Sequence, residues 1–263
     1  MKKISTHVLK AMKDNNDKFA VVTTYDYAFS KIVSNANIEV SLVGDSLGNV
    51  FQGRSTTIPV TIEEMAYHMN AVNRGNENSL LVCDMPFMSY STVKDALQNA
   101  AILMQAGAQM IKVEGGEWLA ESVYKLSQRG IPVCGHVGLT PQSVNKLGGN
   151  KVQGKDKSDA EKMVKDALIL QDAGADLLVV ECVPSRLGAD LTSALSIPVI
   201  GIGAGPDTDG QVLVSYDMLG LSDRLPKFAK NFLNETNSVQ EAITLFGNEV
   251  RNGLFPGPDN CFK

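Results

Sequence analysis

The sequence is short of the residues that mark several common classes of protein. Aromatic side chains make up 6% of the 263 residues, and there are only three histidines. The cysteines are too far apart to form a Cys-x-x-Cys pair, which argues against a zinc knuckle, and three of them lie in or beside apolar runs typical of strands. We therefore expect reduced, buried thiols and a reducing compartment. The four cysteines are Cys83, Cys134, Cys182 and Cys261.

Long apolar runs and an excess of basic charge are also missing. No stretch approaches the roughly 18 apolar residues of a spanning helix, and the first residues lack the apolar core of a secretion signal. Lysine and arginine number 24 against 29 acidic residues, a formal net charge of −5. Nucleic acid and anionic membranes are therefore disfavoured as partners. We expect a cytoplasmic protein.

Short apolar runs alternate with helical patterns from one end of the chain to the other. Such runs are typical of parallel strands covered on both faces, and eight βα units favour a closed (β/α)8 TIM barrel. An open, doubly wound sheet is the alternative, but no Gly-x-Gly-x-x-Gly follows the first strand. We expect one domain, 1–263, with a helical tail over about 223–263. The expected strands are 19–23, 40–44, 79–83, 109–113, 131–135, 176–180, 197–201 and 211–214.

Local signals predict where several helices begin and end. Three pairs have capping-box spacing: Thr61 with Glu64, Ser158 with Glu161, and Ser238 with Glu241. Gly107, Gly130 and Gly174 stand where helices should end before the next strand. The segments 46–60 and 137–157 are expected to be long loops.

Ionisable residues follow five of the expected strands directly. In a βα barrel the carboxyl ends of all strands meet at one face, so these side chains should gather there. Four clustered carboxylates repel one another unless a cation or protons compensate, and oxygen ligands favour Mg²⁺. The alternative is that each acid only caps a helix or faces water. The five residues are Asp45, Asp84, Glu114, His136 and Glu181.

Strand alternation places a lysine inside the expected barrel. Met110, Lys112 and Glu114 share one face of a strand, and the opposite face is wholly aliphatic. Because buried lysines are rare unless paired, we expect Lys112 to contact an acid, an anionic substrate or both. Glu181 falls on the inner face of its strand by the same alternation.

These residues together predict a magnesium-dependent enzyme that acts on a small anionic oxo or enolisable substrate. A metal can chelate an α-keto acid and stabilise its enolate, while a glutamate free of the metal removes the proton. His136 is open to roles as an acid, a hydrogen-bond donor or a ligand. The Gly-rich segment 201–205 either binds phosphate or allows close packing of the backbone.

Seven segments, several of which contain these residues, resemble the ketopantoate hydroxymethyltransferase (3-methyl-2-oxobutanoate hydroxymethyltransferase) family. The resemblance implies a (β/α)8 barrel and Mg²⁺. It also implies hydroxymethyl transfer from 5,10-methylenetetrahydrofolate to 3-methyl-2-oxobutanoate, which gives 2-dehydropantoate in pantothenate and coenzyme A biosynthesis. The ordered segments are VGDSLG (43–48), TTIPVT (56–61), DMPFMSY (84–90), IKVEGG (111–116), HVGLTPQS (136–143), GIGAG (201–205) and TDGQVLV (208–214).

The resemblance also assigns roles to individual residues. Asp45 and Asp84 match the metal ligands, and Glu114 matches an acid of the metal site. Glu181 matches the base that forms the enolate. The positions that match keto-acid contacts are Asp45, Ser46, Asp84, Lys112 and His136.

The chain departs from the family pattern at two positions. Tyr216 precedes Asp217 where a histidine is expected, and Thr24 stands where alanine is more frequent. Members of the family are commonly homodecamers, so the resemblance implies a homo-oligomer. Two other functions remain open: a phosphoenolpyruvate mutase or isocitrate lyase relative, and a non-catalytic barrel.

Overall fold

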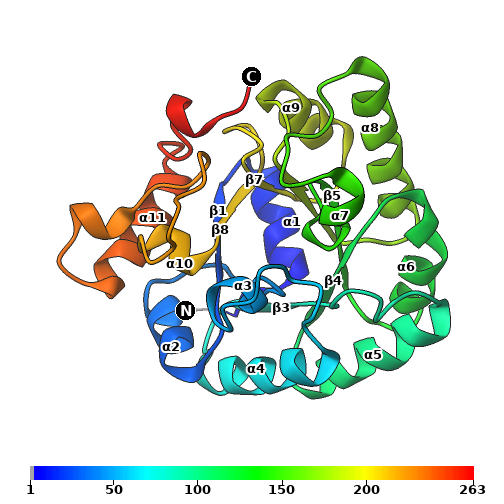
Figure 1. Ribbon diagram of the computed structural model, residues 1–263, viewed down its shortest axis with the longest axis horizontal. Helices are drawn as coiled ribbons and strands as arrows, with labels where there is room; N and C mark the ends of the chain where they lie inside the picture. Colours follow the sequence, from blue (N-terminus) through cyan, green and yellow to red (C-terminus); the bar gives the residue numbers. More distant parts are fainter. Residues whose placement is uncertain (1–2) are drawn as a thin grey trace.

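The computed structural model describes residues 3–263, which form a closed barrel of eight parallel strands in chain order (Figure 1). The barrel closes where β8 pairs with β1. All eight predicted strands are present and the predicted (β/α)8 fold is confirmed. The strands are β1 (Phe19–Thr23), β2 (Val40–Val43), β3 (Leu80–Asp84), β4 (Met110–Glu114), β5 (Val133–Gly138), β6 (Leu177–Glu181), β7 (Val199–Ile202) and β8 (Gly210–Leu213).

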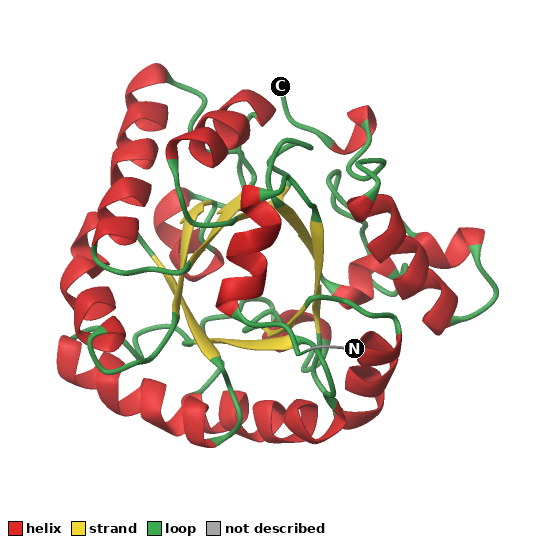
Figure 2. Cartoon of the chain, turned by 180° about the vertical axis from the view of Figure 1, so that it is seen from behind, coloured by secondary structure: helices red, strands yellow, loops and turns green. Residues whose placement is uncertain are grey.

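Helices surround the barrel and cover its outer face (Figure 2). None of the helices within residues 3–263 is both long and apolar enough to cross a bilayer. The α-helices are α1 (Thr6–Asp14), α2 (Tyr27–Asn35), α3 (Leu47–Val50), α4 (Ile62–Gly75), α5 (Val93–Gln105), α6 (Ala120–Ser127), α7 (Val144–Leu147), α8 (Lys157–Asp172), α9 (Ser185–Ala194), α10 (Ser215–Met218) and α11 (Val239–Arg251). Four 3-10 helices are η1 (Glu117–Leu119), η2 (Pro141–Ser143), η3 (Phe232–Glu235) and η4 (Pro258–Asn260).

Alternation along each strand divides the core into two layers. On β4, Met110 belongs to the cluster inside the barrel, whereas Ile111 and Val113 pack with the helices outside it. Lys112 and Glu114 therefore point inward, as their spacing predicts. The lower interior is apolar, and the charged side chains that line the cavity lie at the carboxyl ends of the strands, so the fold gathers them at one mouth.

The opposite mouth is closed by α1. Ser5 caps this helix by accepting a hydrogen bond from the Val8 amide, and Leu9 is completely buried. Leu9 packs in the same cluster as Phe19 and Met110 inside the barrel. Figure 2 shows α1 lying across the barrel opening from this side.

The last helix, α11, covers β1 and packs on α2 rather than standing apart. Its final residue, Arg251, donates from Nε to the Glu39 carboxylate over 2.8 Å. Glu39 also accepts from the Ala20 amide over 2.9 Å, which ties α11 to the start of the barrel. The segment 223–263 thus contains one long helix and two 3-10 turns joined by irregular chain.

Several predicted boundaries are wrong by a few residues. The capping box at Thr61 is complete, but α8 begins at Lys157 after Asp156, not at Ser158. Ser238 caps α11 as predicted, although the Glu241 carboxylate bonds the amide of Asn237 instead. The expected loops 46–60 and 137–157 contain the short helices α3, η2 and α7, and β5 extends to Gly138.

Candidate active site

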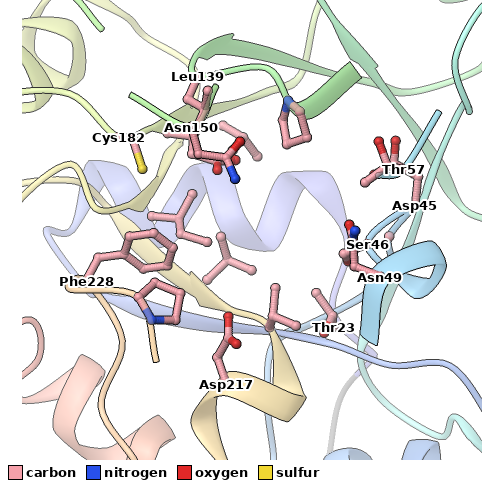
Figure 3. Close-up of a pocket in the computed structure, with 18 of the residues that line it drawn as sticks. Thr23, Asp45, Ser46, Asn49, Thr57, Leu139, Asn150, Cys182, Asp217 and Phe228 are labelled. Carbon is pink, nitrogen blue, oxygen red and sulfur yellow. The ribbon is translucent and has the colours of Figure 1, made fainter. Parts of the chain in front are cut away.

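A cavity of about 680 Å³ opens at the carboxyl ends of the strands. Figure 3 shows Asp45, Ser46 and Asn49 entering it from one side and Asp217 and Phe228 from others. Every site residue predicted from the sequence lines this one cavity, so the gathering expected from the fold is confirmed. These residues are Asp45, Ser46, Asp84, Lys112, Glu114, His136 and Glu181.

A buried ion pair between neighbouring strands forms the floor of the cavity. Lys112 Nζ lies 2.8 Å from Asp84 Oδ1 and 3.9 Å from Glu114 Oε1. All three side chains are at most 5% exposed, so water screens them little. Burial alone would lower the pKa of Lys112, but Asp84, Glu114 and Asp45 raise it above its usual value. Lys112 is thus a fixed cation, paired as its position predicts.

Asp45 lies beside this pair on the loop after β2. Its backbone amide donates to Asp84 Oδ2 over 3.1 Å, which brings the two carboxyl groups together. Burial and the charges of Glu114 and Asp84 raise the pKa of Asp45 well above its ordinary value. An added cation would relieve this repulsion and restore the ionised form of Asp45.

The carboxylates of Asp45 and Asp84 fit a magnesium ion better than a metal that takes all of its ligands from the protein. Among residues 3–263, no three histidine, cysteine, aspartate or glutamate side chains form a compact metal-binding group. Mg²⁺ is commonly held by only one or two carboxylates, with water and substrate completing its shell. Glu114 is already engaged by Lys112, His136 and the Gln142 amide.

His136 lies between two glutamates. Its Nδ1 is 3.4 Å from Glu114 Oε1 and its Nε2 is 3.3 Å from Glu181 Oε2, but neither contact has hydrogen-bond alignment. Burial and the Lys112 charge favour the neutral ring, yet the two carboxylates outweigh them and raise the pKa of His136 to about 9. The ring is therefore a second buried cation. His136 lies within β5, opposite Glu114 of β4 in the strand register. The prediction that His136 follows the strand is therefore wrong.

Glu181 ends β6 and is the more accessible of the two glutamates. Its side chain is 14% exposed, against 2% for Glu114. Cys182, the next residue, has a φ of +48°, which turns the chain sharply after the carboxylate. The neighbouring strand approaches closely through Gly138, whose φ is +92° and where a Cβ would collide with the Glu181 carbonyl oxygen. Backbone packing therefore sets the position of Glu181.

Ser46 presents its hydroxyl to the same cavity. Its Oγ lies 2.9 Å from the hydroxyl of Tyr25, a buried residue of the segment after β1. Gly44 makes room for this arrangement, because a Cβ there would lie 2.8 Å from Ser46 Oγ. Either hydroxyl can act as the donor, so Ser46 remains able to bond a ligand.

The sequence analysis did not identify Gln142. This residue of η2 donates hydrogen bonds to two acids of the site. Its side-chain nitrogen donates to Asp45 Oδ2 and to the Met85 carbonyl, each over 2.9 Å. Its backbone amide donates to Glu114 Oε2 over 3.0 Å, and Tyr90 donates to its Oε1. The segment 136–143 carries Gln142, but a loop glutamine gives no signal in itself.

The Gly-rich segment 201–205 serves close packing. A Cβ at Gly203, whose φ is +62°, would lie 3.0 Å from Phe262 and 3.1 Å from Phe228. A Cβ at Gly205 would meet Ser185 at 2.6 Å. The glycines thus allow two aromatic rings to reach the cavity wall.

The ketopantoate hydroxymethyltransferase family matches residues 3–258 of this chain. The chain belongs to that family. Two relatives are named 3-methyl-2-oxobutanoate hydroxymethyltransferase 1 and 3-methyl-2-oxobutanoate hydroxymethyltransferase. They are 54% and 53% identical to this chain over 264 residues, and each alignment covers all of both chains. They come from Aliivibrio fischeri and Colwellia psychrerythraea.

Solved structures with other names share the barrel fold of this chain. A putative phosphonomutase from Burkholderia cenocepacia has a TM-score of 0.64 at 15% identity, covering 82% of this chain and 95% of its own. Phosphonopyruvate hydrolase, solved with oxalate and Mg²⁺, has a TM-score of 0.62 at 13% identity and covers 97% and 98%. At such identities the likeness shows the barrel alone.

Proposed function

We propose that this chain transfers a hydroxymethyl group from 5,10-methylenetetrahydrofolate to 3-methyl-2-oxobutanoate. The products are 2-dehydropantoate and tetrahydrofolate, and water supplies the hydroxyl oxygen. The carrying observation is the cavity in which Asp45, Asp84, Lys112 and Glu181 converge, in a chain 54% identical to a relative of that name. This reaction uses each of these groups, whereas a non-catalytic barrel has no need for buried charges of this kind.

The keto acid would bind on the floor of the cavity. Lys112 offers a fixed positive charge to an anionic substrate, and the Ser46 hydroxyl offers a hydrogen bond. Asp45 and Asp84 would hold Mg²⁺, with Glu114 acting on the site through water while it positions Lys112 and His136. Bound Mg²⁺ would polarise the keto acid and stabilise the negative charge of its enolate. The low exposure of these residues strengthens every electrostatic contact with the substrate.

Glu181 would remove the proton at C3. Among residues 3–263, His136 alone lies within ion-pair distance of the Glu181 carboxylate, whereas Asp84 and Glu114 are engaged by Lys112. His136 would keep that carboxylate aimed at the substrate and stay protonated through the step. Water would open the methylene bridge of the folate, and the one-carbon unit would leave both folate nitrogens as formaldehyde while each nitrogen gains a proton. The C3 carbanion equivalent then adds to the formaldehyde carbon, and the oxygen takes the proton held by Glu181 to complete the hydroxymethyl group.

Product formation tests the proposal directly. NMR should detect 2-dehydropantoate from the two substrates with Mg²⁺ and none after a chelator is added. Exchange of the C3 proton in heavy water without product would keep the enolising site and exclude this folate as the donor. Folded protein that shows neither reaction would refute the proposed function.

We also expect a homo-oligomer, as the family resemblance implies. Large apolar side chains lie on the surface of the chain, among them Tyr67 at 73% exposure and Phe51 at 49%. A second subunit covering them would remove apolar area from water. Sedimentation velocity would give the oligomeric state, and a monomer at micromolar concentration would contradict this expectation.

A further inference from the structure

The cavity is also lined by a carboxylate that has fewer polar contacts than the acids on the floor. Asp217 lies on α10, directly after β8, and is 8% exposed. It lines the cavity, and Figure 3 shows its carboxylate pointing inward from a different side than Asp45. The reaction steps described above leave this residue without a role.

The Asp217 carboxylate is incompletely paired. Ser222 donates to Oδ1 over 2.5 Å, and within residues 3–263 no cationic side chain lies within ion-pair distance. Oδ2 has no hydrogen-bond partner in this part of the chain. Burial raises the pKa of Asp217, and the Ser222 hydroxyl only partly opposes it. A buried carboxylate lacking a cation is costly unless a ligand supplies donors.

Apolar and aromatic side chains make up much of the cavity wall that includes Asp217. Arg224 and Lys227 also line the cavity, but neither forms an ion pair with Asp217 within residues 3–263. Val212, Val214 and Pro226 line the cavity with it, and Phe228 and Phe262 add two rings. Figure 3 shows Phe228 and Asp217 entering the cavity from neighbouring sides of the view. Flat apolar walls with one polar anchor are typical of sites for planar heterocycles, because rings stack on the walls while the polar group fixes orientation.

The size of the cavity leaves space for such a ligand. A volume of about 680 Å³ lies within the usual range for drug-sized molecules, and a short keto acid fills only part of it. The rest must accept the one-carbon donor if the proposed function is correct. That donor carries a planar pteridine whose N3–H and 2-amino groups point the same way and match the two oxygens of a carboxylate.

We propose that Asp217 binds the pteridine of the folate co-substrate, accepting hydrogen bonds from N3–H and the 2-amino group between apolar walls that include Phe228. This inference rests on the proposed function. The edge of the pteridine that carries the reacting one-carbon unit is opposite to the anchored edge. Asp217 thereby aims the unit away from α10 and toward the keto acid over Lys112.

The test compares Asp217→Asn with Asp223→Asn, an exposed carboxyl of the following segment that does not line the cavity. Asp217→Asn should raise KM for 5,10-methylenetetrahydrofolate and Kd for tetrahydrofolate on the order of ten- to a hundredfold. Its Kd for 3-methyl-2-oxobutanoate and the C3 proton exchange should stay at the wild-type level, which also shows that the variant folds. Asp223→Asn should match the wild type throughout.

A modified ligand gives a second readout. A tetrahydrofolate analogue without the 2-amino group should bind the wild type at least tenfold more weakly than the parent, and Asp217→Asn should reduce this ratio toward one. Equal affinity of analogue and parent for the wild type would overturn the inference, as would an unchanged folate KM in Asp217→Asn. A wild type that exchanges the C3 proton but binds no reduced folate would overturn the inference together with the donor assignment, leaving only the enolising site.

Discussion

Gln142 donates its side-chain amide to Asp45 over 2.9 Å, although 97 positions separate the two residues in the chain. The contact joins the segment after β5 to the loop after β2 across the mouth of the barrel. Because the backbone amide of Gln142 also donates to Glu114, one neutral residue spaces two carboxylates that would otherwise repel each other.

We predict that Gln142→Ala weakens magnesium activation. Asp45 loses a donor that fixes its orientation, and the loss of such supporting contacts typically costs about 10- to 100-fold in metal affinity or activity. The magnesium concentration for half-maximal turnover should rise accordingly. Gln128→Ala, at an exposed position outside the cavity, is the control. An unchanged magnesium requirement would remove Gln142 from the positioning of Asp45.

Glu181→Gln should retain keto-acid binding and lose turnover. The amide keeps the shape of the side chain but cannot accept the C3 proton, and general-base catalysis typically contributes about 10²–10⁴-fold. Both kcat and the rate of C3 exchange in heavy water should fall together. The exposed Glu121→Gln serves as the matched control. Near-normal exchange in Glu181→Gln would assign the base to another residue.

Lys112→Met should destabilise the fold as well as weaken keto-acid binding. Removing one partner of a buried pair leaves Asp84 and its neighbouring acids uncompensated, typically at a cost of about 3–5 kcal/mol. Urea unfolding measures the loss, and Lys94→Met on the exposed face of α5 should change little. The double variant Lys112→Met/Asp84→Asn should regain part of the stability. If it is no more stable than Lys112→Met, the loss does not arise from the unpaired charge.

Two glycine substitutions should separate the destabilising effect of backbone strain from that of a steric collision by the added Cβ. Gly130 has a φ of +74° and open space within 4 Å of where an added Cβ would lie, so Gly130→Ala should cost only about 1–2 kcal/mol for the left-handed conformation. Gly138→Ala adds a collision with the Glu181 carbonyl oxygen and should cost clearly more. It should also lower kcat by displacing Glu181, which thermal unfolding and steady-state kinetics would show. Equal losses of stability in the two variants would contradict the close approach of β5 and β6.

The fold and most of the site follow from patterns that repeat along the chain. The inward direction of Lys112 and Glu114 depends only on strand alternation, which needs no knowledge of neighbours. The start of β5 was harder to predict, because Pro132 lacks an amide to donate and the strand begins only at Val133. Asp156 and Ser158 are both acceptable caps for α8, and the sequence does not rank them.

The roles of Gln142 and Asp217 depend on which loops meet in space. A glutamine in a turn and an aspartate after a strand are ordinary in sequence. Their importance arises from the distance between Gln142 and Asp45, and from the absence of a cation near Asp217 in the part of the chain that the structure describes. Such relationships exist only after the barrel has closed.

The helix α1 makes the barrel a dead end. With Leu9 and the aliphatic layers filling the opposite mouth, whatever reaches Lys112 must pass the walls near Asp217 on the way in and again on the way out. A folate lying there blocks the exit for anything below it. If the folate binds beside Asp217 as proposed, we expect the keto acid to enter first and its product to leave last. A nine-residue helix on the far side of the molecule would then set an order of binding and release by closing the other route.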